Sequence, residues 1–182
     1  MNGSLFTGER VRLTALDPDQ GVEAFQRWSL DSELGRLLSA SGWRPTSRQA
    51  AQEDLGQTVK PHWFPFLIHT LAEDRLIGMV DLDVDNWNHR NGWIGIGLGE
   101  RATWGQGYGT DAMRLIVRYG FQELDLYRIT LTVFEYNPRA VRSYEKVGFE
   151  VEGRLRQALH KDGRRADILV MGLRRANWER PA

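Results

Sequence analysis

A glycine-rich segment near the middle of the chain has the composition of an anion-binding loop. It reads Gly105-Gln106-Gly107-Tyr108-Gly109-Thr110, and its glycines allow positive φ angles that bring backbone N–H groups close to a ligand. The apolar residues after it recur with helical spacing, so the loop lies at a helix N-terminus, where free N–H groups and the helix dipole favour negative charge. The segment therefore predicts a phosphate site to which Thr110 can add a hydroxyl; a glycine turn that serves only packing is the alternative.

The kind of phosphate ligand depends on what surrounds this loop. A P-loop is excluded, because Gly-x-x-x-x-Gly-Lys-Ser/Thr occurs nowhere in the sequence. The stretch 107–112 fits the dinucleotide pattern Gly-x-Gly-x-x-Gly/Ala, but only 73 of the 182 residues follow Gly109 (182 minus 109). A doubly wound dinucleotide fold needs more parallel units than this remainder supplies, so a dinucleotide enzyme is the weaker interpretation.

A short run of acidic residues is the second feature that could take part in chemistry. Asp81, Asp83 and Asp85 alternate with apolar residues, so they share one face of a predicted strand. Three aligned carboxylates could attract a cationic amine. A solvated strand face is the simpler alternative.

Composition argues against several other classes of function. The chain has no cysteine and no Gly-x-Ser-x-Gly elbow, and His62, His69, His89 and His160 lack the spacing of metal ligands, so we expect no metal ion. Lys+Arg 24 balances Asp+Glu 24, which argues against nucleic acid as the main partner. No long apolar run and no leader pattern occur, so we expect a cytoplasmic protein without a membrane span.

The elements that must position these groups follow from the hydrophobic pattern. Apolar runs predict strands at 10–16, 64–71, 76–84, 92–99, 128–133, 149–160 and 165–173. Capping residues and helical spacing predict helices at 17–28, 31–38, 46–59, from Gly109 onward, and from Asn137 to about 147. Since no linker is visible, we expect residues 1–182 to form a single α/β domain (mixed α+β), a mixed sheet with helices on both faces.

Two motifs occur at a separation that is more specific than either motif alone. The first is the segment 104–112, Trp-Gly-Gln-Gly-Tyr-Gly-Thr-Asp-Ala, and the second comprises 133–140 and 143–149. Together they resemble the GCN5-related N-acetyltransferases (GNAT), in the branch of ribosomal-protein N-terminal and polyamine acetyltransferases. The resemblance is strongest from about Leu76 to Leu173. It implies a largely antiparallel sheet of about seven strands, and acetyl-CoA as the acetyl donor.

The resemblance also implies which residues bind acetyl-CoA. In the family the glycine loop holds the pyrophosphate, which agrees with the backbone argument above. The end of the preceding strand pairs with the pantetheine arm and polarises the thioester carbonyl; this end maps onto Ile96, Gly97 and Leu98. Asn137 matches a residue that contacts the cofactor arm, and it can also cap the following helix. Trp104 departs from the Gln or Arg that many members carry at its position.

The same resemblance assigns the general acid of the reaction more clearly than its general base. Tyr144 matches a tyrosine that protonates the departing thiolate, with a core aromatic as the alternative. Relatives often use a Glu as the base at the position of Trp93, so this role is vacant or has moved. The candidates are the three acids of the short run and Glu135, at the end of a later strand. Deprotonation through water would need no dedicated residue.

These features favour an acyltransferase that moves acetyl from acetyl-CoA directly to a primary amine. The acceptor is a protein N-terminus, a polyamine, or an amino sugar such as an aminoglycoside. Its wall is expected among aromatic residues, which alternatively serve packing: Trp43, Trp63, Phe64, Trp87 and Trp93. A homodimer is expected from the resemblance alone. A non-catalytic acyl-CoA sensor is the alternative function.

Overall fold

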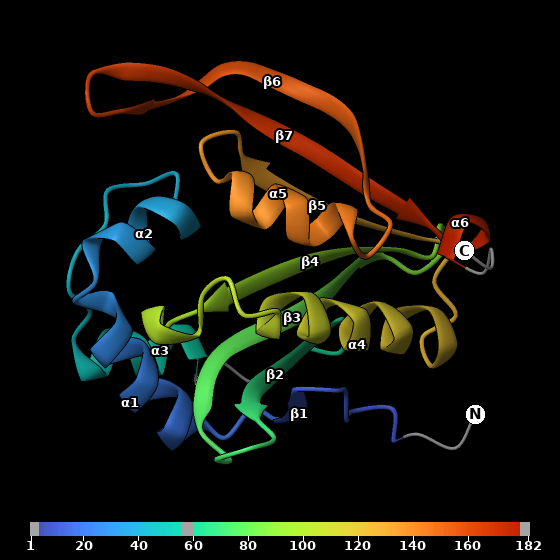
Figure 1. The fold of residues 1–182 in the computed structure, drawn as a ribbon, viewed down its shortest axis with the longest axis horizontal. Coiled ribbons are helices and arrows are strands. Elements are labelled where there is room, and N and C mark those ends of the chain that lie inside the picture. The colour runs from blue at the N-terminus through green and yellow to red at the C-terminus, as the bar shows by residue number, and fades with distance from the viewer. Residues whose placement is uncertain (1–3, 56–59, 179–182) are drawn as a thin grey trace.

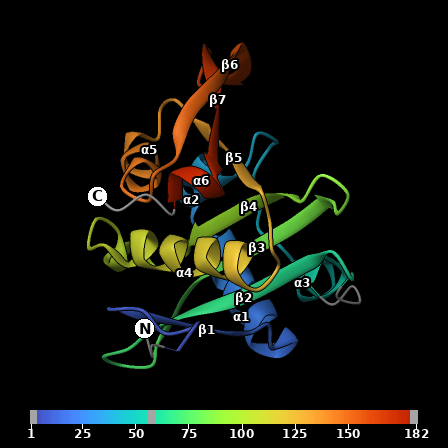
Figure 2. The same ribbon diagram turned by 90° about the vertical axis from the view of Figure 1, so that its right-hand side faces the viewer.

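The computed structural model describes residues 4–55 and 60–178, which form one sheet flanked by helices (Figures 1 and 2). Neighbouring strands follow the order β1-β2-β3-β4-β5-β7-β6, and every pair is antiparallel except β4 with β5. The strands are β1 (Val11–Ala15), β2 (Trp63–Thr70), β3 (Leu76–Asn86), β4 (Asn91–Leu98), β5 (Arg128–Phe134), β6 (Glu150–Lys161) and β7 (Arg164–Arg174). This confirms the predicted mixed, largely antiparallel sheet of seven strands.

The helices cover both faces of this sheet. Figure 2 shows α4 and α5 on one side and α3 on the other, and α1 packs on α3. Their bounds are α1 (Pro18–Ser29), α2 (Ser32–Leu38), α3 (Arg48–Leu55), α4 (Tyr108–Gln122), α5 (Pro138–Glu145) and the short α6 (Arg175–Trp178). A single 3-10 turn, η1 (Arg101–Thr103), leads into the glycine loop. The placement of helices on both faces is confirmed, whereas α6 was not predicted.

Side-chain caps explain where the first helices begin. The Asp17 carboxylate accepts the N–H of Gln20 (3.0 Å) at the start of α1, as its sequence predicts. For the third helix the prediction is wrong by one residue. Ser47, not Thr46, caps α3 by accepting the N–H of Ala50 (3.1 Å). The predicted end of that helix, near 59, lies outside the described residues.

The core lies mainly between α4 and the sheet. The apolar face of α4 packs against central strands, with Met113, Ile116 and Val117 fully buried. One polar residue on the same helix is also buried: Asp111 is 5% exposed. Its carboxylate accepts the N–H groups of Arg10 (2.8 Å) and Val11 (3.0 Å). Asp111 thereby attaches the first strand to the helix that follows the glycine loop.

The two halves of the sheet separate between β4 and β5. These parallel strands pair only from Asn91–Arg128 to Trp93–Thr130, after which β5 continues alongside β7. Among the described strands, the edge of β4 that faces β5 therefore has no partner beyond Trp93. The divergence opens a gap in the sheet next to the glycine loop.

A long hairpin of β6 and β7 reaches from this gap to α2 (Figure 1). Asp162 and Gly163 have positive φ angles (50° and 69°), as the predicted Asp-Gly turn requires. At the tip, Asp162 forms an ion pair with Arg36, and Lys161 donates to the carbonyl of Ser41 (2.9 Å). The hairpin tip is thus attached to the α2 region.

Candidate functional site

A cavity of about 460 Å³ occupies the gap between β4 and β5. At one end it is lined by the glycine loop and α5, and at the other by three leucines of α2: Leu34, Leu37 and Leu38. We call these the glycine-loop end and the α2 end. Ligand sites commonly lie in such concave, partly apolar spaces. The cavity connects the predicted phosphate site with the opposite face of the sheet.

The glycine loop has the backbone geometry that anion binding requires. Gly105 and Gly107 have φ angles of 76° and 89°, which disfavour any residue with a Cβ atom. Gly107 is the N-cap of α4 and offers no side chain, and the first helical hydrogen bond runs from Asp111 N–H to the Gly107 carbonyl (3.0 Å). The backbone N–H groups of residues 108–110 precede that bond, so they have no acceptor within the helix and can bind a phosphate.

Basic side chains from α5 and its C-cap line the same cavity and add positive charge to it. They are Arg139, Arg142 and Lys146, and the Arg139 guanidinium lies 4.3 Å from the centre of the Trp104 ring. These residues are not among the site residues expected from the sequence. Their spacing of three and seven positions, which places them on one face of a helix, was the signal that could have found them. Together with the loop they form a site suited to a diphosphate.

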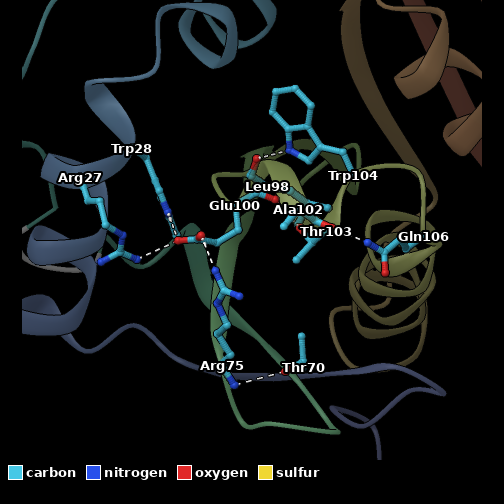
Figure 3. A network of polar contacts seen from close by, with 10 residues as sticks. All are labelled: Arg27, Trp28, Thr70, Arg75, Leu98, Glu100, Ala102, Thr103, Trp104 and Gln106. Atoms are coloured by element: carbon cyan, nitrogen blue, oxygen red, sulfur yellow. Dashed lines mark hydrogen bonds and ion pairs between the residues drawn. The ribbon is translucent and has the colours of Figure 1, made fainter.

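Backbone groups of β4 are available at the edge of the gap. Gly99 N–H donates to Ile77 on the β3 side (2.9 Å), and because this direction alternates along a strand, Ile96 and Leu98 face β5. Ile96, Gly97 and Leu98 all line the cavity. The Leu98 carbonyl already accepts the Trp104 indole N–H (2.8 Å; Figure 3). The remaining groups suit an extended, amide-containing arm.

The segment that leads into the glycine loop is fixed by Glu100, at the centre of the network in Figure 3. Its carboxylate accepts from the Trp28 indole N–H (2.9 Å), from Arg27 (2.9 Å) and from Arg75 (2.6 Å). Burial alone would raise the pKa of Glu100, but these three donors outweigh it and lower the pKa. Thr103 then closes η1 by donating to the Glu100 carbonyl (2.6 Å). Glu100 thus positions the loop from outside the cavity.

A second ion-pair group connects η1 with α2. Arg101 contacts the carboxylates of Asp31, which caps α2, and Glu33. The hydrogen bond from Arg101 is the main reason that the pKa of Asp31 falls to about 2. The wall at the α2 end is therefore tied to the segment that carries the glycine loop.

Tyr144 projects from α5 into the lining of the cavity. Within residues 4–55 and 60–178 its hydroxyl forms no hydrogen bond, while its ring packs near Phe149 (6.3 Å between centroids). Burial raises the pKa of the phenol to about 12, so the hydroxyl keeps its proton near neutral pH. It can therefore donate a proton or a hydrogen bond to a group in the cavity. The role of Tyr144 as the general acid stays a prediction.

Two other predicted residues also line the cavity. Asn137 caps α5 by accepting the N–H of Ala140 (3.2 Å), so the capping role and a place in the cavity lining coexist. The Thr110 hydroxyl lies 2.8 Å from that of Ser143. Thr110 thereby links the glycine loop to α5.

Three predicted site residues do not bring their side chains to this cavity. Gln106 contacts the carbonyl of Ala102, and Tyr108 packs against the core. Glu135, a candidate base, borders a separate hollow near the β6–β7 hairpin. Its carboxylate pairs with Arg154 and accepts the N–H of Asp167 (2.8 Å). The geometry therefore does not support Glu135 as a base.

The three acids of β3 differ in their surroundings, which the alternation of the sequence could not show. Asp85 is exposed, close to a shift in the β3–β4 register. Asp83 is partly exposed and lies 2.7 Å from His62 Nδ1. Asp81 accepts the indole N–H of Trp63 (3.1 Å), and burial raises its pKa to about 6. The alternative of a solvated strand face therefore holds for Asp85 but not for Asp81.

The predicted aromatic wall does not form around the cavity. Of the described residues that line it, none is Trp43, Trp63, Phe64, Trp87 or Trp93. Trp43 donates to a carbonyl at the end of α1 (2.8 Å), while Phe64 and Trp87 pack edge-on (6.3 Å). These residues serve packing or lie elsewhere on the sheet. Instead, the aliphatic side chains of α2 line the α2 end.

In the part of the chain that comprises residues 4–55 and 60–178, no group of three or more His, Asp or Glu side chains could hold a metal ion. None of its helices is long and apolar enough to cross a membrane.

Comparison with known proteins gives consistent matches along most of the chain. A family model described as "Acetyltransferase (GNAT) domain" matches residues 10–150. An SPbeta prophage-derived uncharacterized N-acetyltransferase of Bacillus subtilis is 28% identical over 176 residues, which cover 96% of this chain and 95% of that protein. The spermidine N(1)-acetyltransferase of Vibrio cholerae is 34% identical over 100 residues, which cover 55% and 57% of the two chains.

A solved structure shares the fold at lower identity. The crystal structure of a spermidine N-acetyltransferase from Vibrio cholerae, in complex with CoA and spermine, superposes with a TM-score of 0.82. The match covers 92% of this chain and 97% of the other, at 23% sequence identity. At that identity the likeness concerns the fold.

Proposed function

This chain belongs to the GNAT family of acetyltransferases, as an acetyl-CoA-dependent N-acetyltransferase, and we propose that its acceptor is a primary amine of a small cationic molecule such as a polyamine. The observation that carries the proposal is the continuous cavity, with its basic glycine-loop end and its α2 end beyond the divergence of β4 and β5. Donor and acceptor can approach from opposite ends and meet beside β4. Such orientation of two reactants supplies much of the rate enhancement in direct transfer.

The shape of the α2 end supports a small acceptor over a folded protein. The hairpin tip is attached to α2 through Arg36 and Asp162, and Tyr136 donates to the Arg36 carbonyl (2.9 Å). These contacts narrow the approach that an extended protein N-terminus would need. The matched spermidine N(1)-acetyltransferase of Vibrio cholerae is a relative whose name gives a small polyamine substrate. A protein N-terminus and an amino sugar are the competing acceptors.

In the proposed reaction each group of the chain has a distinct task. The N–H groups after Gly107 and the basic residues of α5 hold the diphosphate of the donor. The backbone of Ile96 faces the gap, where its N–H can bind the thioester oxygen as negative charge develops on it. Tyr144 donates a proton to the sulfur that leaves, and its pKa of about 12 keeps this proton in place beforehand. Acetyl-CoA supplies the activated acetyl group.

Thermal unfolding with and without excess acetyl-CoA tests the donor site, with NADH as the control. A ligand at about 100 times its dissociation constant stabilises the folded state by roughly 2.7 kcal/mol, so the midpoint should rise with acetyl-CoA alone. A rise with NADH alone would restore the dinucleotide interpretation. No rise with either ligand would refute the glycine-loop assignment.

Release of free thiol then tests transfer. We would compare spermidine, kanamycin, a short peptide with a free N-terminus, and phenethylamine, each with acetyl-CoA. Fastest release with spermidine is expected. Binding of acetyl-CoA without release for any amine would instead favour the non-catalytic sensor.

A further inference from the structure

The carboxylate of Asp81 lies next to Gly95, a residue of the cavity lining, although Asp81 itself is not part of that lining. A Cβ atom added to Gly95, which lines the cavity, would lie 2.7 Å from Asp81 Oδ1. Two residues along the same strand, a Cβ atom on Gly97 would lie 3.1 Å from the side chain of Leu38. Because alternate residues share a face, Asp81 and Leu38 lie on the same side of β4. The absence of a side chain at Gly95 gives Asp81 the space that it occupies.

The hydrogen bonds of Asp81 leave part of its carboxylate free. Oδ2 accepts the Trp63 indole N–H (3.1 Å), which fixes the orientation of the group. Oδ1 accepts no hydrogen bond from the described residues, and no Lys or Arg among them forms an ion pair with Asp81. A partly buried carboxylate that lacks a cationic partner can bind a cation from outside the chain.

The charged groups on this face favour a cationic ligand. Asp83 is the charged neighbour that affects Asp81, and its negative charge acts in the same direction as burial. The titratable group next to Asp83 is His62 (2.7 Å). The face thus combines two carboxylates with one histidine, next to the aliphatic α2 end.

We propose that Asp81 binds the ammonium group of the acceptor through Oδ1 and accepts its proton. Asp81 would thereby act as the general base, a role that Trp93 cannot fill because it has no carboxylate. The proposal rests on the function proposed above and adds the base to it. The geometry carries it: a fixed carboxylate with one free oxygen lies one residue along β4 from the backbone of Ile96, which faces the gap.

The proposed transfer moves protons through two side chains, Asp81 and Tyr144. One proton moves from the ammonium to Asp81, and the nitrogen lone pair forms the C–N bond to the acetyl carbon. The C–S bond breaks, its electron pair stays on sulfur, and the sulfur takes the proton of Tyr144. The nitrogen loses its second proton when the amide forms, and this proton restores the phenol. Asp81 returns its own proton to solvent through the cavity.

The raised pKa of Asp81 is consistent with this role. At about 6, the group is ionised near neutral pH yet is a stronger base than an exposed aspartate. The rate should therefore fall below about pH 6, as Asp81 becomes protonated.

The test compares kcat/KM and its pH profile in the full-length protein, using the fastest amine of the panel named above. Asp81→Asn keeps an oxygen that can accept from Trp63 but removes the base. We expect kcat/KM to fall by about 100-fold or more at pH 8, with loss of the acidic limb of the profile. Asp54→Asn, on the exposed side of α3, is the matched control and should keep the wild-type rate.

A second variant separates a chemical role from a structural one. Trp63→Phe removes the hydrogen bond that lowers the pKa of Asp81. The acidic limb should therefore move to higher pH by several tenths of a unit, while acetyl-CoA still raises the unfolding midpoint. A structural role alone would lower the rate at every pH without moving the limb.

The outcomes distinguish the two proposals. If no amine of the panel releases thiol, the proposed function fails, and the role of Asp81 fails with it. If an amine reacts and Asp81→Asn keeps the wild-type rate or the acidic limb, the role of Asp81 alone is overturned. An unmoved limb in Trp63→Phe also contradicts it.

Discussion

Replacing Asp81 with asparagine should stabilise the folded protein at pH 8 even as it removes activity. Burial raises the pKa of this carboxyl from 3.8 to about 6, so the folded state disfavours the charged form. Asparagine has a similar size, carries no charge, and keeps an acceptor for the Trp63 indole N–H. The substitution therefore relieves an electrostatic cost that the native protein bears at neutral pH.

The size of the effect follows from these two pKa values. The difference between 3.8 and about 6 corresponds to roughly 3 kcal/mol of unfolding free energy at a pH well above both. As the pH rises, the unfolded chain releases this proton first, so the wild type loses stability from about pH 4 until the folded carboxyl has ionised, above about pH 6. The difference in unfolding free energy between Asp81→Asn and the wild type should grow by about 2 kcal/mol from pH 4.5 to pH 8.

Urea denaturation at these two pH values measures that growth. Any cost of the new amide group that does not depend on pH cancels in the comparison. Asp54→Asn, an exposed substitution of the same kind, should stay within about 0.5 kcal/mol of the wild type at both pH values. If the difference in unfolding free energy between Asp81→Asn and the wild type stays constant or shrinks as the pH rises, the buried environment assigned to this carboxylate is refuted.

Three further substitutions test other parts of the structure. Tyr144→Phe should lower kcat more than tenfold in the thiol-release assay with little change in acetyl-CoA affinity, because only the proton donor is lost; unchanged kcat would remove the phenol from the reaction. Gly107→Ala should weaken acetyl-CoA binding about tenfold by calorimetry, because alanine is strained at φ 89°. Gly163→Ala places similar strain in the hairpin turn (φ 69°) and should leave that affinity unchanged; equal losses in both would count against the loop. Asp111→Ala should cost about 2–4 kcal/mol in urea denaturation, because it leaves buried N–H groups of Arg10 and Val11 without an acceptor, and a cost below about 0.5 kcal/mol would contradict this contact.

Local signals in the sequence predicted most of the elements. Alternation and caps depend on residues close together in the chain, which is why Asp17 and the Asp162-Gly163 turn were placed correctly. The glycine loop was found for the same reason, since positive φ angles and a helix start are local properties. Ser47 instead of Thr46 shows the usual limit of one residue at a helix end.

The environment of each site residue could not be predicted from local pattern, because it depends on distant segments. Asp81 and Asp85 occupy equivalent places in the alternation of polar and apolar residues along β3. Only Asp81, however, is bound by Trp63 and lies in the space beside Gly95. Glu135 follows its strand as expected, but Arg154, from a later strand, binds its carboxylate. The aromatic residues were assigned to a wall by composition, which does not indicate what each ring packs against.

The parallel contact between β4 and β5 has a consequence for how the protein unfolds. In the described structure only the pairs from Asn91–Arg128 to Trp93–Thr130 join the two halves of the sheet. One apolar core, with Ile68 of β2, Ile116 of α4 and Met171 of β7, connects the two halves, so the short backbone pairing between β4 and β5 is the part of their junction that can open locally. A molecule held by β4 on one side and by α5 on the other would act as a crosslink across this pairing. Amide hydrogen exchange should then slow on binding at the paired residues of β4 and β5.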